Sequence, residues 1–377
     1  MRRVAILTGH MAHQLRRPSL LWVADALRTT GWHVTLVTVG YSWISKLCGD
    51  ARLAALPAPP RSGPVAPGLE AVFGYAPIHP FSTGRDWLDE GLRPLHAGFA
   101  AYWRQRLVRA LAGSEVVIVE SGAPLLLARA ARSAAPEARL IYRVNDDIAL
   151  LGAPRWMVRA EPRLARLCDR LSTASPRLAE RFAHPNVTID PMGLPAADLT
   201  RARPDPFTPR ARVEAVCAGT TQIDLSALCR LARARPRWRL HVLGRLPRPA
   251  DLPANLILHG EQSFEVTLAH IQHADVGLAA YRDRPGVAYQ ADNSNRILLY
   301  RHTGLPILGP AGLCHPSRPT ILDWSDPAAL RRCETWEKRP EPLPDWSDLA
   351  RRLTAPATCE RAKPKPRPSV SAVAARQ

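Results

Sequence analysis

The feature that most constrains the fold is a repeated alternation of short apolar stretches with stretches of helical period. In the first half the stretches that read as strands are 4–8, 34–39, 116–119 and 140–142, and those that read as helices are 19–29, 92–111 and 124–134. Strands that alternate with helices predict a parallel sheet with helices on its faces. The Pro-, Ala- and Gly-rich segment 57–67 is expected to be an exposed loop.

The same alternation starts again after a Pro-rich stretch at 204–209. The later strands are predicted at 213–218, 239–243, 256–258, 275–280 and 305–308, with helices near 224–234 and 293–302. Because single cores stop growing near about 250–300 residues, a 377-residue chain is expected to hold two domains. We predict an α/β architecture with domains at 1–200 and 201–354, followed by a basic, Pro-rich, disordered tail at 355–377.

The charge balance predicts anionic partners. The chain has 51 Lys+Arg against 33 Asp+Glu, and only four of the cations are lysines. A codon preference explains the choice of arginine equally well, but it does not explain the excess of +18.

The cysteines and the apolar runs indicate the cellular compartment of the protein. Seven cysteines form no C-x-x-C pair and no ligand spacing with a histidine, which favours a reducing cytosol. The apolar run after Met1-Arg2-Arg3 is too short for a signal peptide, and no run of 18 uncharged apolar residues occurs. A cytoplasmic protein is therefore expected.

The residues that lead into the predicted helix at 293–302 are typical of a diphosphate site. Helix N-termini favour anions. Asp292 or Asn293 is expected to cap the helix, Ser294 and Asn295 to donate hydrogen bonds, and Arg296 to balance phosphate charge. An ordinary capped helix explains the same residues.

Two further observations bear on the predicted diphosphate site. Gly219-Thr220-Thr221 follows a predicted strand and gives a second, weak phosphate signal. No D-x-D triplet is present, so no metal is predicted on the diphosphate, and Arg296 with the helix dipole takes that role.

Asp146 is the predicted catalytic base, because it follows the buried strand at 140–142 and carboxyl ends of parallel strands carry ligand groups. Asp147 is placed equally well. Either residue also suits a helix N-cap.

Two basic amphipathic stretches suit an anionic lipid surface. Arginines recur among apolar residues from Arg155 to Arg181 and again from Leu92 to Leu111. The alternative, with apolar sides facing inward and solvated arginines, is equally compatible with either stretch.

Several sequence words together resemble one family, the xanthan-type membrane-associated β-glucuronosyltransferases, glycosyltransferase family 70. The words are His79-Pro80-Phe81-Ser82-Thr83, Val117 to Gly122, Leu140 to Arg143 before Asp146, His259-Gly260-Glu261, Ala279-Ala280-Tyr281, Ala291 to Ser294 with Arg296, Gly304-Leu305-Pro306 and Asp345 to Asp348. Retaining glycosyltransferases of similar fold carry an acid-x7-acid motif. The corresponding positions here are Ala291 and Leu299, neither of them acidic, which separates this chain from the retaining enzymes.

The resemblance implies a GT-B fold, in which two Rossmann-like doubly wound domains face a central cleft, and an inverting enzyme of exopolysaccharide biosynthesis. It implies transfer of glucuronate from UDP-glucuronate to a polyprenyl-diphosphate oligosaccharide, peripherally at the inner face of the cell membrane. Asp146 falls at the base position, and the donor positions are Thr221, Glu261, Tyr281, Ser294, Asn295 and Arg296. Arg296 replaces a family lysine, and Thr221 and Asn295 replace other side chains of the nucleotide pocket.

Two other interpretations stay open. The donor is UDP-glucose or another UDP-hexose in the first. In the second the chain is a basic protein that binds nucleic acid or membrane without catalysis, although it has no RNP, zinc-finger or helix-turn-helix pattern. No nucleic-acid partner is therefore predicted.

Overall fold

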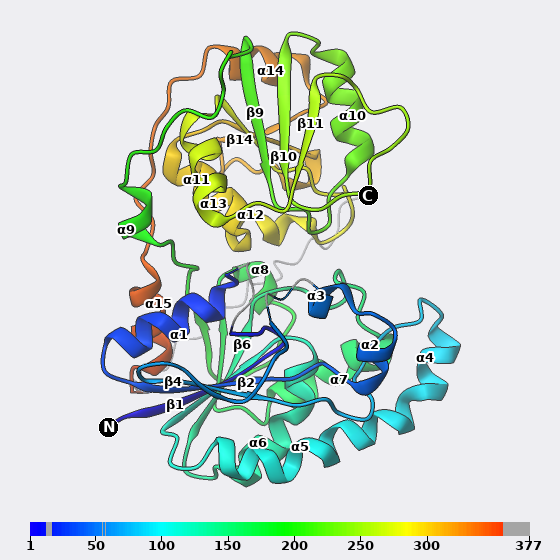
Figure 1. Ribbon diagram of the computed structural model, residues 1–377, viewed down its shortest axis with the longest axis vertical. Helices are drawn as coiled ribbons and strands as arrows, with labels where there is room; N and C mark the ends of the chain where they lie inside the picture. The colour runs from blue at the N-terminus through cyan, green and yellow to red at the C-terminus, as the bar shows by residue number, and fades with distance from the viewer. Residues whose placement is uncertain (13–16, 55, 57, 357–377) are drawn as a thin grey trace, which may run out of the picture.

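The computed structural model describes residues 1–12, 17–54, 56 and 58–356, which form two α/β lobes stacked along the long axis of the molecule (Figure 1). In this described part, the first lobe holds an eight-stranded sheet in the order β3-β4-β2-β1-β5-β6-β7-β8, and the second a six-stranded sheet in the order β11-β10-β9-β12-β13-β14. Every strand pair is parallel except β3 with β4. The prediction of two doubly wound parallel sheets is confirmed.

The first lobe and the linker contain the following elements. The strands are β1 (Arg3–Thr8), β2 (His33–Thr38), β3 (Gly63–Ala66), β4 (Leu69–Phe73), β5 (Val116–Glu120), β6 (Arg139–Val144), β7 (Arg170–Thr173) and β8 (Val187–Ile189). The helices are α1 (Ser19–Thr29), α2 (Trp43–Leu47), α3 (Ala51–Ala54), α4 (Asp86–Leu92), η1 (Arg93–His96), α5 (Ala97–Ala110), η2 (Ala123–Leu127), α6 (Ala128–Ala134), α7 (Arg155–Ala165), α8 (Pro176–Ala179) and α9 (Ala196–Leu199).

The second lobe and the C-terminal helix follow. The strands are β9 (Val213–Ala218), β10 (Trp238–Leu243), β11 (Leu256–Gly260), β12 (Val276–Leu278), β13 (Ile307–Gly309) and β14 (Ile321–Asp323). The helices are α10 (Leu225–Ala234), α11 (Phe264–His273), η3 (Val287–Tyr289), α12 (Gln290–Asn293), α13 (Asn295–Thr303), η4 (Ala311–Leu313), α14 (Pro327–Glu334) and α15 (Trp346–Thr354).

Two local predictions were wrong. The segment 57–67 is not only loop, because Gly63–Ala66 form β3, a short antiparallel edge strand. The basic stretch from Arg155 to Arg181 is not one amphipathic helix, since it contains α7, β7 and α8. The helical stretch expected at 92–111 is present, and it comprises the end of α4, the 3-10 turn η1 and α5.

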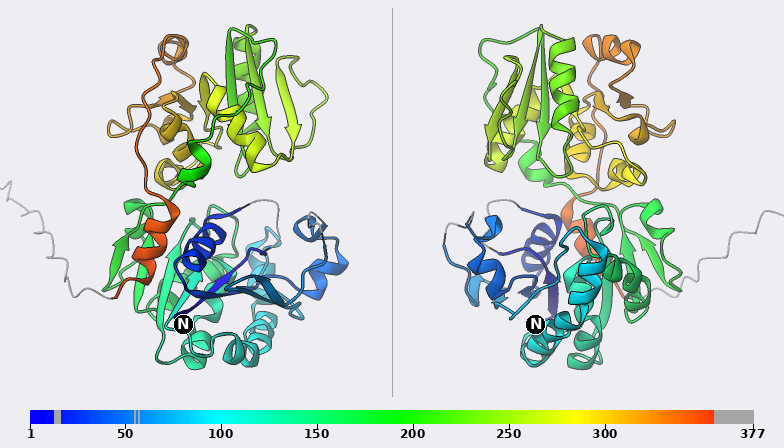
Figure 2. Two further views of the ribbon diagram at one scale, coloured as in Figure 1. Left: turned by 60° about the vertical axis from the view of Figure 1, so that its left-hand side comes forward. Right: turned by 90° about the vertical axis from the view of Figure 1, so that its right-hand side faces the viewer.

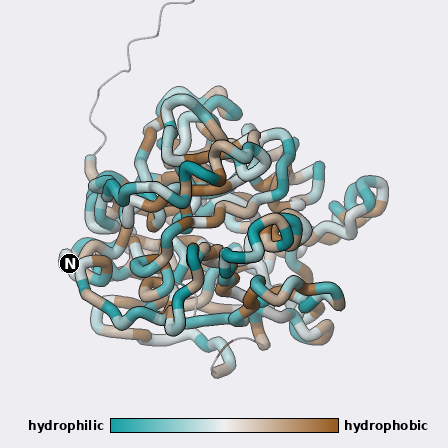
Figure 3. Tube along the Cα trace, turned by 90° about the horizontal axis from the view of Figure 1, so that it is seen from above, coloured by the Kyte–Doolittle hydropathy of each residue, from teal (hydrophilic) through white to brown (hydrophobic). Residues whose placement is uncertain are grey.

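Helices cover both faces of each sheet, as apolar strands in a parallel sheet require. In the first lobe α1 packs on the face that carries Ile6 and Ile118, and α5 with α6 on the face that carries Leu7 and Val119. In the second lobe α10 and α14 cover one face, while α11 and α13 cover the other. Hydrophobic segments consequently run through the interior in the view from above (Figure 3).

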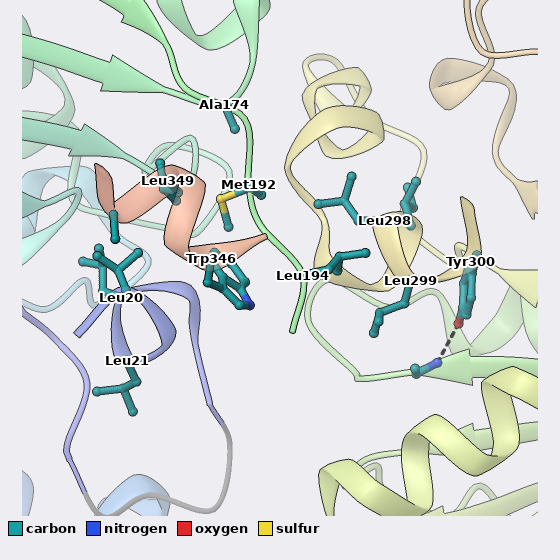
Figure 4. Packing of buried hydrophobic residues seen from close by; sticks show 14 of the residues in the cluster. Leu20, Leu21, Ala174, Met192, Leu194, Leu298, Leu299, Tyr300, Trp346 and Leu349 are labelled. Carbon is teal, nitrogen blue, oxygen red and sulfur yellow. Dashed lines mark hydrogen bonds between the residues drawn. The ribbon is translucent and has the colours of Figure 1, made fainter. Parts of the chain in front are cut away.

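The C-terminal helix α15 returns to the first lobe and packs against α1 (Figure 2). Trp346 lies buried over Gly193, where an added Cβ would come within 2.5 Å of the Trp346 backbone nitrogen. This apolar cluster continues through Met192 and Leu194 towards Leu298 of the second lobe (Figure 4). The domain division at residue 200 stays a prediction, to which the structure adds this return of α15; residues 357–377 of the predicted tail lie outside the described residues.

Candidate functional site

The carboxyl ends of the two sheets meet at the interface between the lobes. Asp146 follows β6, and the Tyr289 hydroxyl of the second lobe donates a hydrogen bond of 3.0 Å to its Oδ1. Next to it, the Asn293 side chain donates to the Asn145 carbonyl. The residues after β6 therefore contact the segment that leads into α13.

The surroundings of Asp146 shift the pKa of its carboxyl group. Burial raises its pKa, and the carboxylates of Glu120 and Asp147 act in the same direction, against the Tyr289 hydrogen bond. Gln290 Nε2 donates to the Tyr289 hydroxyl at 2.6 Å, which leaves that hydroxyl's own proton for Asp146. Tyr289 was not singled out from the sequence, because no local pattern links it to residue 146.

Asp147 makes different contacts. Its Oδ1 accepts from the Ala149 backbone N–H at 2.9 Å and lies 3.0 Å from Arg181 Nη1. These are the contacts of a carboxylate that closes a turn and holds an ion pair. The helix N-cap role that the sequence left open for either aspartate is filled by neither, because no helix begins here, and Asp147 closes a turn instead.

Glu120, at the end of β5, accepts hydrogen bonds from three residues close to Asp146. Its Oε2 accepts from Thr8 Oγ1 at 2.5 Å and from the Gly9 N–H at 3.1 Å, and its Oε1 accepts from Asn145 Nδ2 at 3.0 Å. His10 Nε2 lies 3.5 Å from Oε1. Glu120 belongs to the sequence words of the family resemblance but was assigned no role from the sequence, although adjacent strand ends in a parallel sheet are expected to converge.

Arg296 is a buried cation on the second lobe. Its guanidinium carbon lies 4.8 Å from the centroid of the Tyr281 ring, and its Nη1 is 3.6 Å from Cys217 Sγ. Within the described residues no carboxylate pairs with it, and its Nε has no hydrogen-bond partner. A Cβ at Gly219, whose φ is +84°, would lie 3.6 Å from Nη2, so the backbone of the turn after β9 approaches the guanidinium closely.

The N-terminus of α13 lies beside this guanidinium. Ser294, and neither Asp292 nor Asn293 as predicted, is the N-cap, and its Oγ accepts from the Ile297 N–H. Tyr281 OH donates to the same Oγ at 2.5 Å. Asp292 instead forms an ion pair with Arg318.

The remaining predicted donor residues surround this cluster less closely. Asn295 is the first residue of α13, and its Oδ1 is buried without a hydrogen-bond partner. Thr221 and Glu261 are exposed on the loops after β9 and β11, at the same edge of the sheet. The structure thus brings Asp146, Tyr281 and the start of α13 together, and leaves Thr221 and Glu261 at the exposed loops.

A hollow of about 210 Å³ opens beside the Asp146 loop on the first lobe. Phe81, Ser121, Ile148 and Met157 are among its lining residues, so it joins the two sequence words at 79–83 and 117–122. A larger hollow of about 600 Å³ lies at the start of β2 and β4, on the opposite edge of the sheet from Asp146. The smaller hollow is therefore the one that belongs to the candidate site around Asp146.

Comparisons with known proteins agree with this geometry. Residues 6–174 match the family model of the glucuronosyltransferase GumK N-terminal domain. The chain is 26% identical over 377 residues to the UDP-glucuronate:glycolipid 2-beta-glucuronosyltransferase of Xanthomonas campestris pv. campestris, covering 97% of this chain and 93% of the relative.

Solved structures with a similar fold include the trehalose-6-phosphate synthase OtsA, with a TM-score of 0.58, 14% identity and 93% of each chain covered. The UDP-GlcNAc 2-epimerase of Methanocaldococcus jannaschii has a TM-score of 0.50 and 11% identity, covering 93% of this chain and 98% of that one. These likenesses confirm the predicted GT-B fold. The resemblance predicted from the sequence is confirmed as well: residues 6–174 match the GumK N-terminal domain model, and nearly the whole chain is similar to the Xanthomonas glucuronosyltransferase.

Proposed function

We propose that the protein is an inverting glycosyltransferase that moves glucuronate from UDP-glucuronate to a polyprenyl-diphosphate-linked oligosaccharide. The observation that carries this proposal is Arg296, a buried guanidinium without a carboxylate partner in the described residues, beside the N-terminus of α13. A buried charge is costly unless it is paired, so the site is suited to an anionic ligand. The curated relative, named for UDP-glucuronate and a glycolipid, supplies the donor and the acceptor class.

The donor site favours a diphosphate that leaves without a metal. Arg296, the Ser294-capped start of α13 and the turn at Gly219 lie together, which places a cation beside a helix N-terminus. Negative charge grows on UDP as its bond to the sugar breaks, and these groups stabilise that charge. Thr221 and Glu261 on the surrounding loops and Asn295 at the start of α13 complete the proposed donor set.

Asp146 is the proposed base. A hydroxyl of the acceptor attacks the anomeric carbon on the face opposite UDP, its proton passes to Asp146, and UDP leaves, which inverts the configuration. The Tyr289 hydrogen bond fixes the orientation of this carboxylate. Asp147 is held by Arg181 and a turn, so it is the less suitable base.

The acceptor is proposed to approach from a membrane over α2 and α4. Trp43 and Leu47 on α2 and Trp87 on α4 are exposed, by 52%, 84% and 72% of their surfaces. The apolar side of α7, by contrast, faces inward through Trp156 and Met157, so α7 follows the inward alternative. No helix in the described part of the chain is long and apolar enough to cross a bilayer. We propose peripheral binding to an anionic inner-membrane surface.

The proposal is tested by incubating the protein with radiolabelled UDP-glucuronate and bacterial lipids that carry polyprenyl-diphosphate oligosaccharides. Label is expected in the organic phase with wild-type protein and with Asp147→Asn, and not with Asp146→Asn. Transfer from UDP-glucose in place of UDP-glucuronate would replace the donor. Transfer by Asp146→Asn at the wild-type rate would contradict the assignment of the base.

A further inference from the structure

Three histidines that the proposed transfer does not use meet on the second lobe. His241 lies on β10, His259 on β11 and His270 on α11. One ring nitrogen from each lies within 4.8 Å of those of the other two. The sequence predicted no metal ligands, because residues on two strands and a helix form no short ligand motif.

Hydrogen bonds on the outer side of the cluster determine which nitrogens face inward. His241 Nε2 donates to Glu214 Oε2 at 2.8 Å, and the Glu214 side chain is fully buried. His270 Nδ1 lies 2.8 Å from the Val266 carbonyl, which only accepts, so this nitrogen carries a proton. His241 Nδ1 and His270 Nε2 then remain as lone-pair donors. Metal-bound histidines typically donate their other N–H to a carboxylate or a carbonyl in this way.

His259 completes the set after a rearrangement of the rings. Its Nε2 lies 2.9 Å from His241 Nδ1, and it donates its proton there when no ion is present. Two imidazole nitrogens bound at about 2.0–2.1 Å to one tetrahedral ion lie about 3.3 Å apart. Binding therefore opens the His241–His259 pair by a few tenths of an ångström and closes a separation near the 4.8 Å limit by about 1.5 Å. With transfer of the His259 proton from Nε2 to Nδ1, three lone pairs then point at one position.

The surroundings favour the neutral imidazoles that metals require. Burial lowers the pKa of His259 to about 4, and burial also lowers the pKa of His241. The Phe207 ring covers the cluster, with its centroid 4.8 Å from that of His241 and 5.4 Å from that of His270. His259 is half-buried, which leaves a route for an ion and a fourth position for water.

We propose that His241, His259 and His270 bind one Zn²⁺ ion, which joins β10 and β11 to α11. Imidazole ligands in a three-histidine set suit zinc among the available first-row ions. The site is separate from the proposed chemistry at Asp146. Because Gly260 and Glu261 follow His259 directly, the bound ion also restrains the loop that carries Glu261.

The test uses full-length protein treated with a chelator, equilibrated with Zn²⁺ and passed through a desalting column before its metal content is measured. About one Zn²⁺ per chain is expected for wild type and for the control His315→Gln, which changes an exposed histidine outside the cluster. His259→Gln is expected to lose the ion. Co²⁺ should give the visible absorption of a four-coordinate site with three nitrogen ligands in wild type and in the control alone.

A second variant protects the test against misfolding. Glu214→Gln keeps an acceptor for the Ala211 N–H but weakens the outer hydrogen bond to His241, and it should lower zinc affinity about 10- to 100-fold. Zinc should raise the thermal midpoint of wild type and not that of His259→Gln. Failure of wild type to retain zinc, or equal retention by His259→Gln, would overturn the proposal, and either result leaves UDP binding untouched as a test of the transferase.

Discussion

Replacing Arg296 by methionine separates a ligand-binding cation from a structural one. Methionine keeps most of the side-chain volume and removes the charge. In wild type the guanidinium is buried, its Nε has no partner, and no described carboxylate neutralises it. Apolar replacement of buried ionic groups is often neutral or stabilising, by about 1–4 kcal/mol. The variant without ligand is therefore expected to be as stable as wild type or more stable.

UDP binding should change in the opposite direction. Removing one partner of a buried charge pair costs about 2–5 kcal/mol, and 1.4 kcal/mol corresponds to a factor of ten. Affinity for UDP should then fall by a factor of roughly 30 to several thousand. Titration calorimetry measures this loss, and thermal unfolding with and without UDP measures stability.

Arg301 provides a matched control on the same helix. Its guanidinium is also buried, but it pairs with Glu341 through Nε at 2.8 Å. Arg301→Met should destabilise the fold and leave UDP affinity unchanged. If Arg296→Met instead lowers stability and binds UDP like wild type, the guanidinium is structural and the reasoning is refuted.

Four further substitutions give expectations for the base, the membrane face and the junction between lobes. Because burial raises the folded-state pKa of Asp146, ionising this carboxyl lowers the stability of the fold once the pH exceeds the pKa of an unfolded-state aspartate. In urea titrations Asp146→Asn should therefore be more stable than wild type near neutral pH and equally stable in acid. Tyr289→Phe should move the acidic limb of the kcat/KM profile to higher pH, since the lost hydrogen bond favours the ionised base; an unmoved limb contradicts this contact. Leu47→Glu should weaken binding to anionic vesicles about tenfold to a hundredfold in sedimentation, from a loss of roughly 1.5–3 kcal/mol, without lowering the thermal midpoint. Gly193→Ala should destabilise by at least about 1–3 kcal/mol in denaturant titrations, because its Cβ would meet the Trp346 backbone, and wild-type stability would show that α15 is loosely docked.

The loop after β6 and the start of α13 show what the sequence could not predict. Asp146 and Asp147 were equivalent by spacing, and only their partners distinguish them, Tyr289 from the second lobe for one and Arg181 for the other. The role of Asp146 in catalysis stays a prediction. Ser294 replaced the expected cap because α13 begins at Asn295, two residues later than its apolar pattern predicted.

What the sequence determined by itself was local and periodic. Helix α1 and strand β9 have the predicted bounds, since side-chain periodicity reports which faces of an element are buried. The two α/β units and the family resemblance followed from the order of such elements and words along the chain.

Contacts between residues far apart in sequence were decided only by the tertiary structure. The return of α15 to α1, the hydrogen bond from Tyr289 to Asp146 and the meeting of three histidines each join elements from separate parts of the chain. No periodicity encodes such contacts, because strand order and lobe docking depend on how whole faces bury apolar surface against one another.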